Sequence, residues 1–230
     1  MRGPLAGTGY HIGYTVEGDR MKVVSLSVGG PREVAWNGGT VLTSIFKTPV
    51  ERRLRVTSLN IEGDEQSDLT VHGGLEKAVY AYPSEHYPLW LTDLPDADLS
   101  GAAFGENLTT EGLSEDVKIG DRFRIGTAEF VVTQPRMPCY KLGIKFGRQD
   151  VLRRMLRTGR TGFYFSVAVE GEVGAGDAIE LVRRSEEDLT VADVVRLFTV
   201  EARNQDLLRR AANSSVLPQN WKDYFGERLE

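Results

Sequence analysis

The sequence predicts a mainly β protein with inserted helices, an α+β fold in which a closed or nearly closed β-barrel precedes a small three-helix domain. From Met21 to about Arg183, short strand-like runs alternate with turns of Gly, Pro, Asn and Asp. After Arg184 the apolar residues recur at helical spacing. We therefore expect the barrel over residues 21–184 and the helices over 185–230. Residues 1–20 are polar, rich in Gly and without a period, and we expect this extension to contribute little to the fold.

The barrel region contains one clear hairpin signal and several weaker strand patterns. Asn37-Gly38-Gly39 separates two strand-like runs, and Asn-Gly is a preferred pair for a tight hairpin turn. Further strands are expected over residues 22–28, 52–59, 128–133, 163–169 and 178–182, with a strand–turn–strand unit over 117–125. Helices are expected over residues 84–93 and 149–157, and the apolar residues of the second follow helical spacing.

The last segment has the pattern of three short helices. Thr190-Val191-Ala192-Asp193 resembles a capping box and predicts a helix through about Phe198. Two more helices are expected over residues 201–213 and 218–229. The second of these places Trp221, Tyr224 and Phe225 at i, i+3 and i+4, which indicates the core of the bundle itself. The alternative is that these helices dock a reductase.

Composition excludes several classes of protein. The net charge of −5 argues against a general binder of nucleic acid or of membrane surfaces, since both need a basic face. One cysteine cannot form an intramolecular disulfide or a four-cysteine metal site. No apolar run approaches the roughly 20 residues that cross a bilayer, and the N-terminus lacks an apolar signal core. We therefore expect a cytoplasmic protein without a membrane partner.

The only cysteine, Cys139, lies in the stretch Gln134-Pro135-Arg136-Met137-Pro138-Cys139-Tyr140-Lys141. The two prolines fix φ and remove two backbone donors, so we expect the preceding strand to end and a stiff loop to hold the cysteine. The neighbouring cations Arg136 and Lys141 favour thiolate, the form that ligates metals or attacks electrophiles. A lone cysteine is also commonly a small buried hydrophobe, and the local string leaves both interpretations open.

Other stretches offer groups that could meet Cys139. His72-Gly73-Gly74 places an imidazole beside a backbone that an anion or flat ring can approach closely, and Lys77 follows. Asn107, in Phe104-Gly105-Glu106-Asn107, offers a donor and an acceptor. Lys47 and Tyr164 are weaker candidates. Each has a plainer structural alternative, such as a glycine turn, a turn asparagine or a solvated lysine.

Taken together, these strings resemble the MOSC family, the molybdenum-cofactor sulfurase C-terminal domain, and in particular its stand-alone YiiM-type members. The resemblance runs from Met21 to the C-terminus, and the strings occur in the family's order. The strings that carry it are MKVVSLSVGGPREVAWNGGTVLTSIFKTPV, DLTVHGGLEKAVYAYPSEHYPLW, FGENLTTEGL, KIGDRFRIGTAEFVVTQPRMPCYKLG and RTGFYFSVAVEGEVGAGDAIEL. The tail resembles the three-helix domain that follows MOSC in this subgroup.

The resemblance implies a β-barrel with a pocket for molybdenum cofactor, a molybdopterin whose dithiolene holds the metal. Cys139 would be the protein thiolate on molybdenum, because a soft sulfur ligand suits a metal already held by dithiolene. Arg136 and Lys141 would lower the pKa of the thiol or hold the cofactor phosphate. The residues implied to contact the pterin or its phosphate are His72, Gly73, Gly74, Lys77 and, as a further cation, Lys47. Asn107 would lie near the metal.

The resemblance also implies reduction of small N-hydroxylated compounds, such as 6-hydroxylaminopurine, to amines by N–O cleavage. His72 would be the first candidate for the proton source because its ordinary pKa lies nearest neutrality, and Tyr164 is a weaker one. The chain has no ferredoxin-like cysteine set, flavin motif or nicotinamide fingerprint, so we expect a separate electron-donating reductase. The alternative is a molybdenum-cofactor carrier, or a sulfur-transfer protein that uses a Cys139 persulfide.

Overall fold

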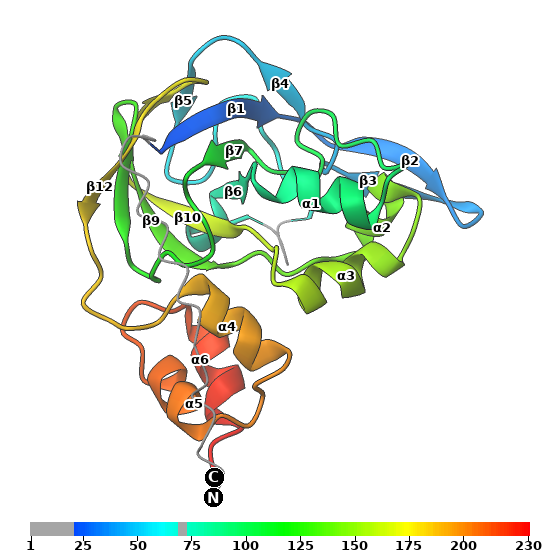
Figure 1. The fold of residues 1–230 in the computed structure, drawn as a ribbon. Helices are drawn as coiled ribbons and strands as arrows, with labels where there is room; N and C mark the ends of the chain where they lie inside the picture. The colour runs from blue at the N-terminus through cyan, green and yellow to red at the C-terminus, as the bar shows by residue number, and fades with distance from the viewer. Residues whose placement is uncertain (1–20, 69–72) are drawn as a thin grey trace, which may run out of the picture.

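The computed structural model describes residues 21–68 and 73–230, and its centre is an eight-stranded sheet (Figure 1). The strand order is β12-β8-β9-β10-β6-β7-β1-β4. Within this sheet β6 and β7 run parallel, and every other neighbouring pair is antiparallel. The bounds are β1 Lys22–Val28, β4 Thr48–Val50, β6 Val79–Pro83, β7 Leu108–Glu111, β8 Arg122–Ile125, β9 Ala128–Pro135, β10 Phe163–Val169 and β12 Ile179–Arg183. The expected mainly β class with helices is confirmed.

Two small sheets and the helices complete the described part of the chain. β2 (Arg32–Trp36) pairs with β3 (Gly39–Thr43), and β5 (Leu54–Val56) pairs with β11 (Gly171–Val173). The helices are the 3₁₀ turn η1 Leu75–Lys77, α1 His86–Asp93, α2 Tyr140–Phe146, α3 Asp150–Thr158, α4 Val191–Phe198, α5 Gln205–Ala212 and α6 Gln219–Gly226. Among these described helices, none combines the length and the hydropathy that crossing a lipid bilayer requires.

The hairpin prediction is confirmed at the turn between β2 and β3. Asn37 and Gly38 both have positive φ, 50° and 77°, which is the conformation that a two-residue hairpin turn needs. The strand–turn–strand unit expected over residues 117–125 is only half formed. Its second part is β8, whereas Lys118 makes an isolated bridge to Thr190 in the C-terminal segment.

The barrel expected to be closed or nearly closed does not close fully, because the outer edge of β1 is shared between two partners. β4 pairs with residues 26–28 of β1, whereas the start of β1 meets the chain before β12 at an isolated bridge between Lys22 and Ala178. The Val23 amide donates to the Asp177 carbonyl at 2.9 Å beside this bridge. The sheet therefore curls until its two edges touch, but in the described chain no ladder joins β12 to β1.

Two predicted helices in the sheet region are confirmed, and one α-helix of the described chain has no counterpart in the sequence analysis. The segments expected over 84–93 and 149–157 correspond to α1 and α3, whose ends differ from the expected ones by at most two residues. The unexpected helix is α2, which begins directly after Cys139 and ends at Gly147 in the left-handed conformation. Its sequence, YKLGIKF, is too short for a clear period and contains Gly143, a poor helix former.

The three C-terminal helices form as expected, and they pack into the core of the sheet rather than only against one another. Thr190 and Asp193 make the predicted capping box of α4. α5 begins later than expected, because Asn204 caps it by accepting from the Leu207 amide at 3.2 Å. Phe225 is fully buried in the same apolar cluster as Phe123 of β8. The two parts of the chain thus share one core.

Candidate functional site

Cys139 lies between the last strand residue, Pro135, and the first turn of α2. Its backbone is extended, with φ −111° and ψ 166°, and its carbonyl accepts the Leu142 amide at 2.9 Å. The preceding turn is anchored where the Arg136 amide donates to the Gly162 carbonyl at 3.1 Å. The thiol is half-buried and is not in a disulfide. The predicted stiff loop is therefore four residues long, with a strand and a helix fixing its two ends.

Cys139 lines a cavity that encloses about 610 Å³, part of it open to solvent. The sequence-predicted residues on its wall are Lys47, Gly73, Lys77, Asn107, Arg136, Cys139, Lys141 and Tyr164. Gly74 does not line it, although Gly73 and Gly74 both have positive φ, 87° and 83°, as a close backbone turn requires. His72 lies outside the described residues. Segments far apart in the sequence therefore meet around one sulfur.

Arg136 is a buried cation on this wall. It is 5% exposed, and no carboxylate of the described residues pairs with it. Its Nη1 lies 3.8 Å from the Met155 sulfur, and its guanidinium lies 5.6 Å from the centroid of the Tyr80 ring. Burial acts to lower the pKa of Arg136, but attraction to Tyr80 and Cys139 outweighs it and the pKa is raised. A buried cation without a carboxylate suits an anionic ligand.

Two lysines on the same wall differ in their partners. Lys141 is 8% exposed and donates from Nζ to the Ser67 hydroxyl at 2.9 Å, again without a carboxylate partner in the described chain. Lys47 instead forms an ion pair with Asp64. Burial lowers the pKa of Lys47, although attraction to Asp64 opposes the shift. Because Lys141 bonds a neutral hydroxyl whereas Lys47 pairs with a carboxylate, the charge of Lys141 is the one available to an anionic ligand.

Asn107 is held by backbone groups on two strands. Its side-chain Oδ1 accepts the Tyr80 amide at 3.1 Å, and its Nδ2 donates to the Ser27 carbonyl at 3.3 Å. Its own backbone carbonyl accepts the Ser27 amide at 2.8 Å. The side chain therefore joins β1 to β6 just before β7 begins. The geometry gives Asn107 a positioning task at the cavity wall, whereas its predicted proximity to a metal stays a prediction.

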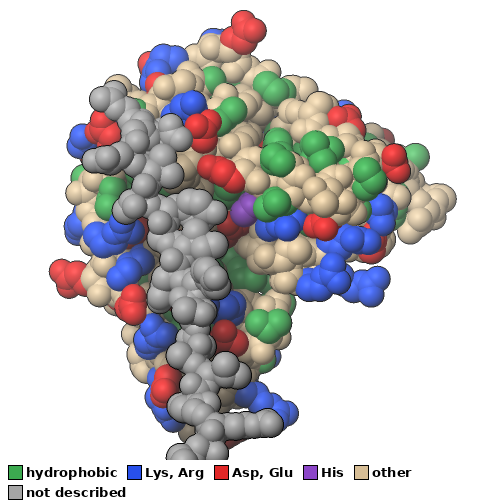
Figure 2. All heavy atoms as spheres, viewed as in Figure 1, with side chains coloured by type: hydrophobic (Ala, Val, Ile, Leu, Met, Phe, Trp, Pro, Cys, Tyr) green, Lys and Arg blue, Asp and Glu red, His purple; other side chains and the backbone are tan. Residues whose placement is uncertain are grey.

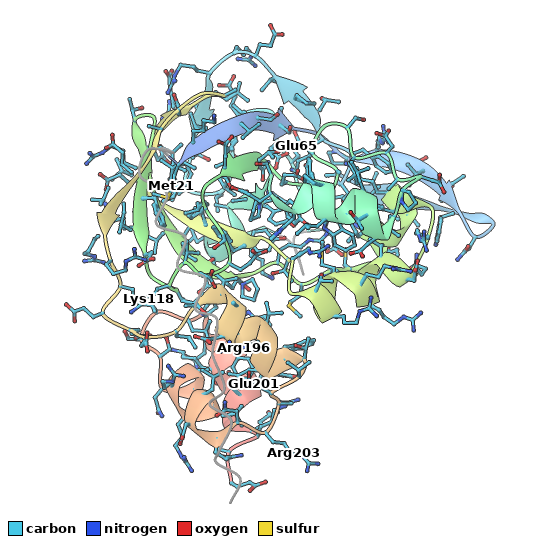
Figure 3. All side chains as sticks on the ribbon, in the orientation of Figure 1. Met21, Glu65, Lys118, Arg196, Glu201 and Arg203 are labelled. Carbon is cyan, nitrogen blue, oxygen red and sulfur yellow. The ribbon has the colours of Figure 1, made fainter. Side chains whose placement is uncertain are left out.

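The sequence analysis missed several residues of the cavity wall. The missed side chains that matter most are Asp64, Glu65, Ser67, Tyr80 and Phe104. Asp64 accepts the Gly29 amide at 3.0 Å, and its buried Oδ2 has no hydrogen-bond partner. Glu65, labelled in Figure 3, follows it along the chain. A usable signal was present, since only three residues separate the polar run GDEQSD from the His72-Gly73-Gly74 stretch that was singled out.

Comparison with known proteins decides the family. The MOSC domain model matches residues 68–180, and the model of the YiiM-like, 3-alpha helix domain matches residues 189–230. The uncharacterized protein YflK of Bacillus subtilis is 41% identical over 213 residues, covering 92% of this chain and 96% of that protein. YiiM of Escherichia coli is 41% identical over 182 residues, or 78% of this chain and 81% of that protein. The chain is a member of the MOSC domain family.

The structural comparison agrees with this MOSC assignment. The crystal structure of YiiM from Geobacillus stearothermophilus has a TM-score of 0.77 at 34% identity, covering 91% of this chain and 100% of that one. A protein of Gibberella moniliformis described as a reductase is 36% identical over 198 residues. That alignment covers 84% of this chain but 35% of the fungal protein. A reductase is thus among the relatives of this MOSC chain.

MOSC domains are associated with binding of molybdenum cofactor, and the residues of this cavity fit such a group. Arg136 and Lys141 are buried cations without carboxylate partners in the described chain, as a bound phosphate would require. The Cys139 sulfur is a soft donor of the kind that molybdenum–sulfur chemistry uses. Within the described residues, no group of three or more His, Cys, Asp and Glu side chains could hold a metal ion.

Proposed function

We propose that this MOSC protein is a molybdenum-cofactor-dependent reductase of small N-hydroxylated compounds, with 6-hydroxylaminopurine as one substrate. The observation that carries the proposal is the Cys139 thiol beside two buried, carboxylate-free cations, Arg136 and Lys141, on one cavity wall. The reductase-named fungal relative supports the reaction class. Cys139 is not in a disulfide, which suits the cytoplasm, where cysteines stay reduced.

The residues of the wall divide into those that ligate and those that hold charge. Cys139 would ligate the metal through its sulfur, and Arg136, Lys141 and Lys77 would hold the phosphate of the pterin. Gly73, and beside it Gly74, would let the pterin approach the backbone. When bound, the cofactor supplies two-electron, oxygen-accepting redox chemistry. Lys47 would act mainly through its ion pair with Asp64, which shapes the wall beneath the ligand.

The proposed reaction is R–NHOH + 2 e⁻ + 2 H⁺ → R–NH₂ + H₂O, so the N–O bond breaks and the substrate is reduced. Tyr164 lines the cavity, and burial raises the pKa of its phenol although attraction to Arg136 opposes the shift. The phenol therefore stays protonated at neutral pH and can donate to the leaving oxygen. His72 remains the other proton-source candidate. The electrons would come from a separate reductase protein.

The test compares wild type with Cys139→Ser, both produced in a host that makes molybdenum cofactor. Molybdenum and pterin content are measured first, followed by reduction of 6-hydroxylaminopurine with dithionite-reduced viologen. We expect near-stoichiometric molybdenum and turnover in wild type, and loss of turnover in the variant. Cofactor binding without turnover in either protein, together with labile sulfane sulfur on Cys139, would favour the carrier and sulfur-transfer alternative. Absence of cofactor from both proteins would overturn the proposal.

A further inference from the structure

The segment from the start of α2 to two residues beyond α3 carries an unusual local charge for this chain. Residues 140–160 contain seven Lys and Arg side chains and one acid, Asp150, whereas the whole chain has 28 Lys and Arg against 33 Asp and Glu. This local excess of positive charge stands in a protein with a net charge of −5. Such a concentration on an acidic protein produces a directed field that attracts anionic partners.

The exposed positive charge lies on one side of α3. Val151 and Met155 are fully buried, whereas Arg153 and Arg157, each two residues further along, lie on the opposite side and are exposed. Arg148 and Arg154 share the carboxylate of Asp150. Arg153 and Arg157 have no carboxylate partner in the part of the chain that the structure describes. We call Arg148, Arg153, Arg154 and Arg157 the α3 basic face; Figure 2 shows Lys and Arg side chains gathered over this region.

The inner side of the same helix reaches the cavity wall. The Met155 sulfur lies 3.8 Å from Nη1 of Arg136, which lines the cavity together with Cys139. One helix therefore separates the α3 basic face from the candidate site, a thickness of roughly 10–12 Å with side chains. A protein docked on the outer side of α3 would hold its redox group near the site without entering the cavity.

We propose that the α3 basic face docks an acidic flavin-containing electron carrier of the flavodoxin type. The inference rests on the proposed function, which requires two electrons for each N–O bond and assigns them to a separate protein. A one-electron carrier would deliver them in two successive encounters, and opposite charges on the two faces would accelerate each encounter. The C-terminal helices are the rival docking surface, but their aromatic side chains Trp221 and Phe225 are buried in the shared core.

The experiment measures turnover of 6-hydroxylaminopurine with a purified acidic flavodoxin, kept reduced by NADPH and a flavodoxin reductase. Arg153→Glu/Arg157→Glu is compared with a control of equal charge change, Arg183→Glu/Arg203→Glu. Both control residues are exposed, and Arg203 is labelled on the three-helix domain in Figure 3. We expect the α3 variant to lose about tenfold or more in the second-order rate with flavodoxin, and the control to stay within about twofold. Arg153→Gln/Arg157→Gln should show a smaller loss.

Two additional readouts separate failure of this inference from failure of the proposed function. Viologen-driven turnover needs no docking, so it tests the proposed function alone and should be equal in all variants. Binding of oxidised flavodoxin by calorimetry at low salt needs no turnover, and we expect the α3 variant alone to lose it. Equal loss in the α3 and control variants, or viologen turnover in a wild type that flavodoxin cannot reduce, would overturn the inference. A third outcome would also overturn the inference. If the α3 variant no longer bound a labelled oligonucleotide that wild type binds, while its rate with flavodoxin stayed unchanged, the face would serve a nucleic acid.

Discussion

Lys47 and Asp64 form an ion pair on the wall of the Cys139 cavity, with side chains that are 8% and 0% exposed. Burying an ion pair costs desolvation free energy, but removing only one partner destabilises the protein more, because the other partner is left as an uncompensated buried charge. Lys47→Met should therefore destabilise the protein by about 3 kcal/mol, measured by urea unfolding. Lys47→Met/Asp64→Asn should recover most of this loss, since the amide oxygen can still accept from Gly29. A double variant less stable than the single one would show that Asp64 is held by other groups.

Arg136 should show opposite effects on stability and on cofactor retention. Its guanidinium is buried without a carboxylate in the described chain, so replacing it by Met removes a desolvated cation and leaves no acid unpaired. We expect Arg136→Met to retain or raise the melting temperature of the cofactor-free protein while the molybdopterin content falls severalfold. The measurements are calorimetry of the unloaded protein and pterin fluorescence of the loaded one. A large loss of stability with unchanged loading would make Arg136 a structural cation.

Lys145 should make the free energy of unfolding depend on pH. Burial lowers the pKa of its ammonium group to about 8, and Nζ donates to the Ala102 carbonyl at 2.6 Å. Between about pH 8 and the ordinary value near 10.4, the unfolded chain binds the proton and the folded chain does not, so stability rises with pH in this window. Relative to Lys145→Met, wild type should gain up to about 3 kcal/mol between pH 7 and 10. The free energies of unfolding of wild type and Lys145→Met are measured with urea. A difference between them that does not change from pH 7 to pH 10 would contradict the lowered pKa of Lys145.

Phe225 should report whether the sheet and the C-terminal helices unfold together. The side chain is fully buried and stacks on Trp221, whose Nε1 donates to Gln134 of β9 at 2.9 Å. Phe225→Ala should cost about 3–5 kcal/mol and lower the midpoint of one common calorimetric transition. For the same reason, removal of all residues after Arg184 should damage folding as a whole. Two separate transitions, with only one of them shifted, would show that the C-terminal helices fold independently.

The sequence predicted those parts of the candidate site that depend on local chemistry. Cys139 directly after two closely spaced prolines, the glycine pair and the nearby cations were recognisable as strings, and most of them line one cavity. Asp64 and Tyr80 were not recognisable in this way. Asp64 matters because it pairs with Lys47, and Tyr80 because its ring lies beside Arg136. Both contacts join residues far apart in the sequence, so the spacing of residues along the chain does not predict them.

Local patterns in the sequence determined the strands, the Asn37-Gly38 turn and the capping box of Thr190, because backbone conformation there follows from neighbouring side chains. Tertiary structure alone decided that the two edges of the sheet meet only at an isolated bridge between Lys22 and Ala178. It also decided that α2 forms after Cys139 and that Arg136 is buried without a carboxylate in the described chain. These outcomes depend on which surfaces meet. Burial and pairing arise between segments far apart in sequence, and their energies are absent from any local pattern.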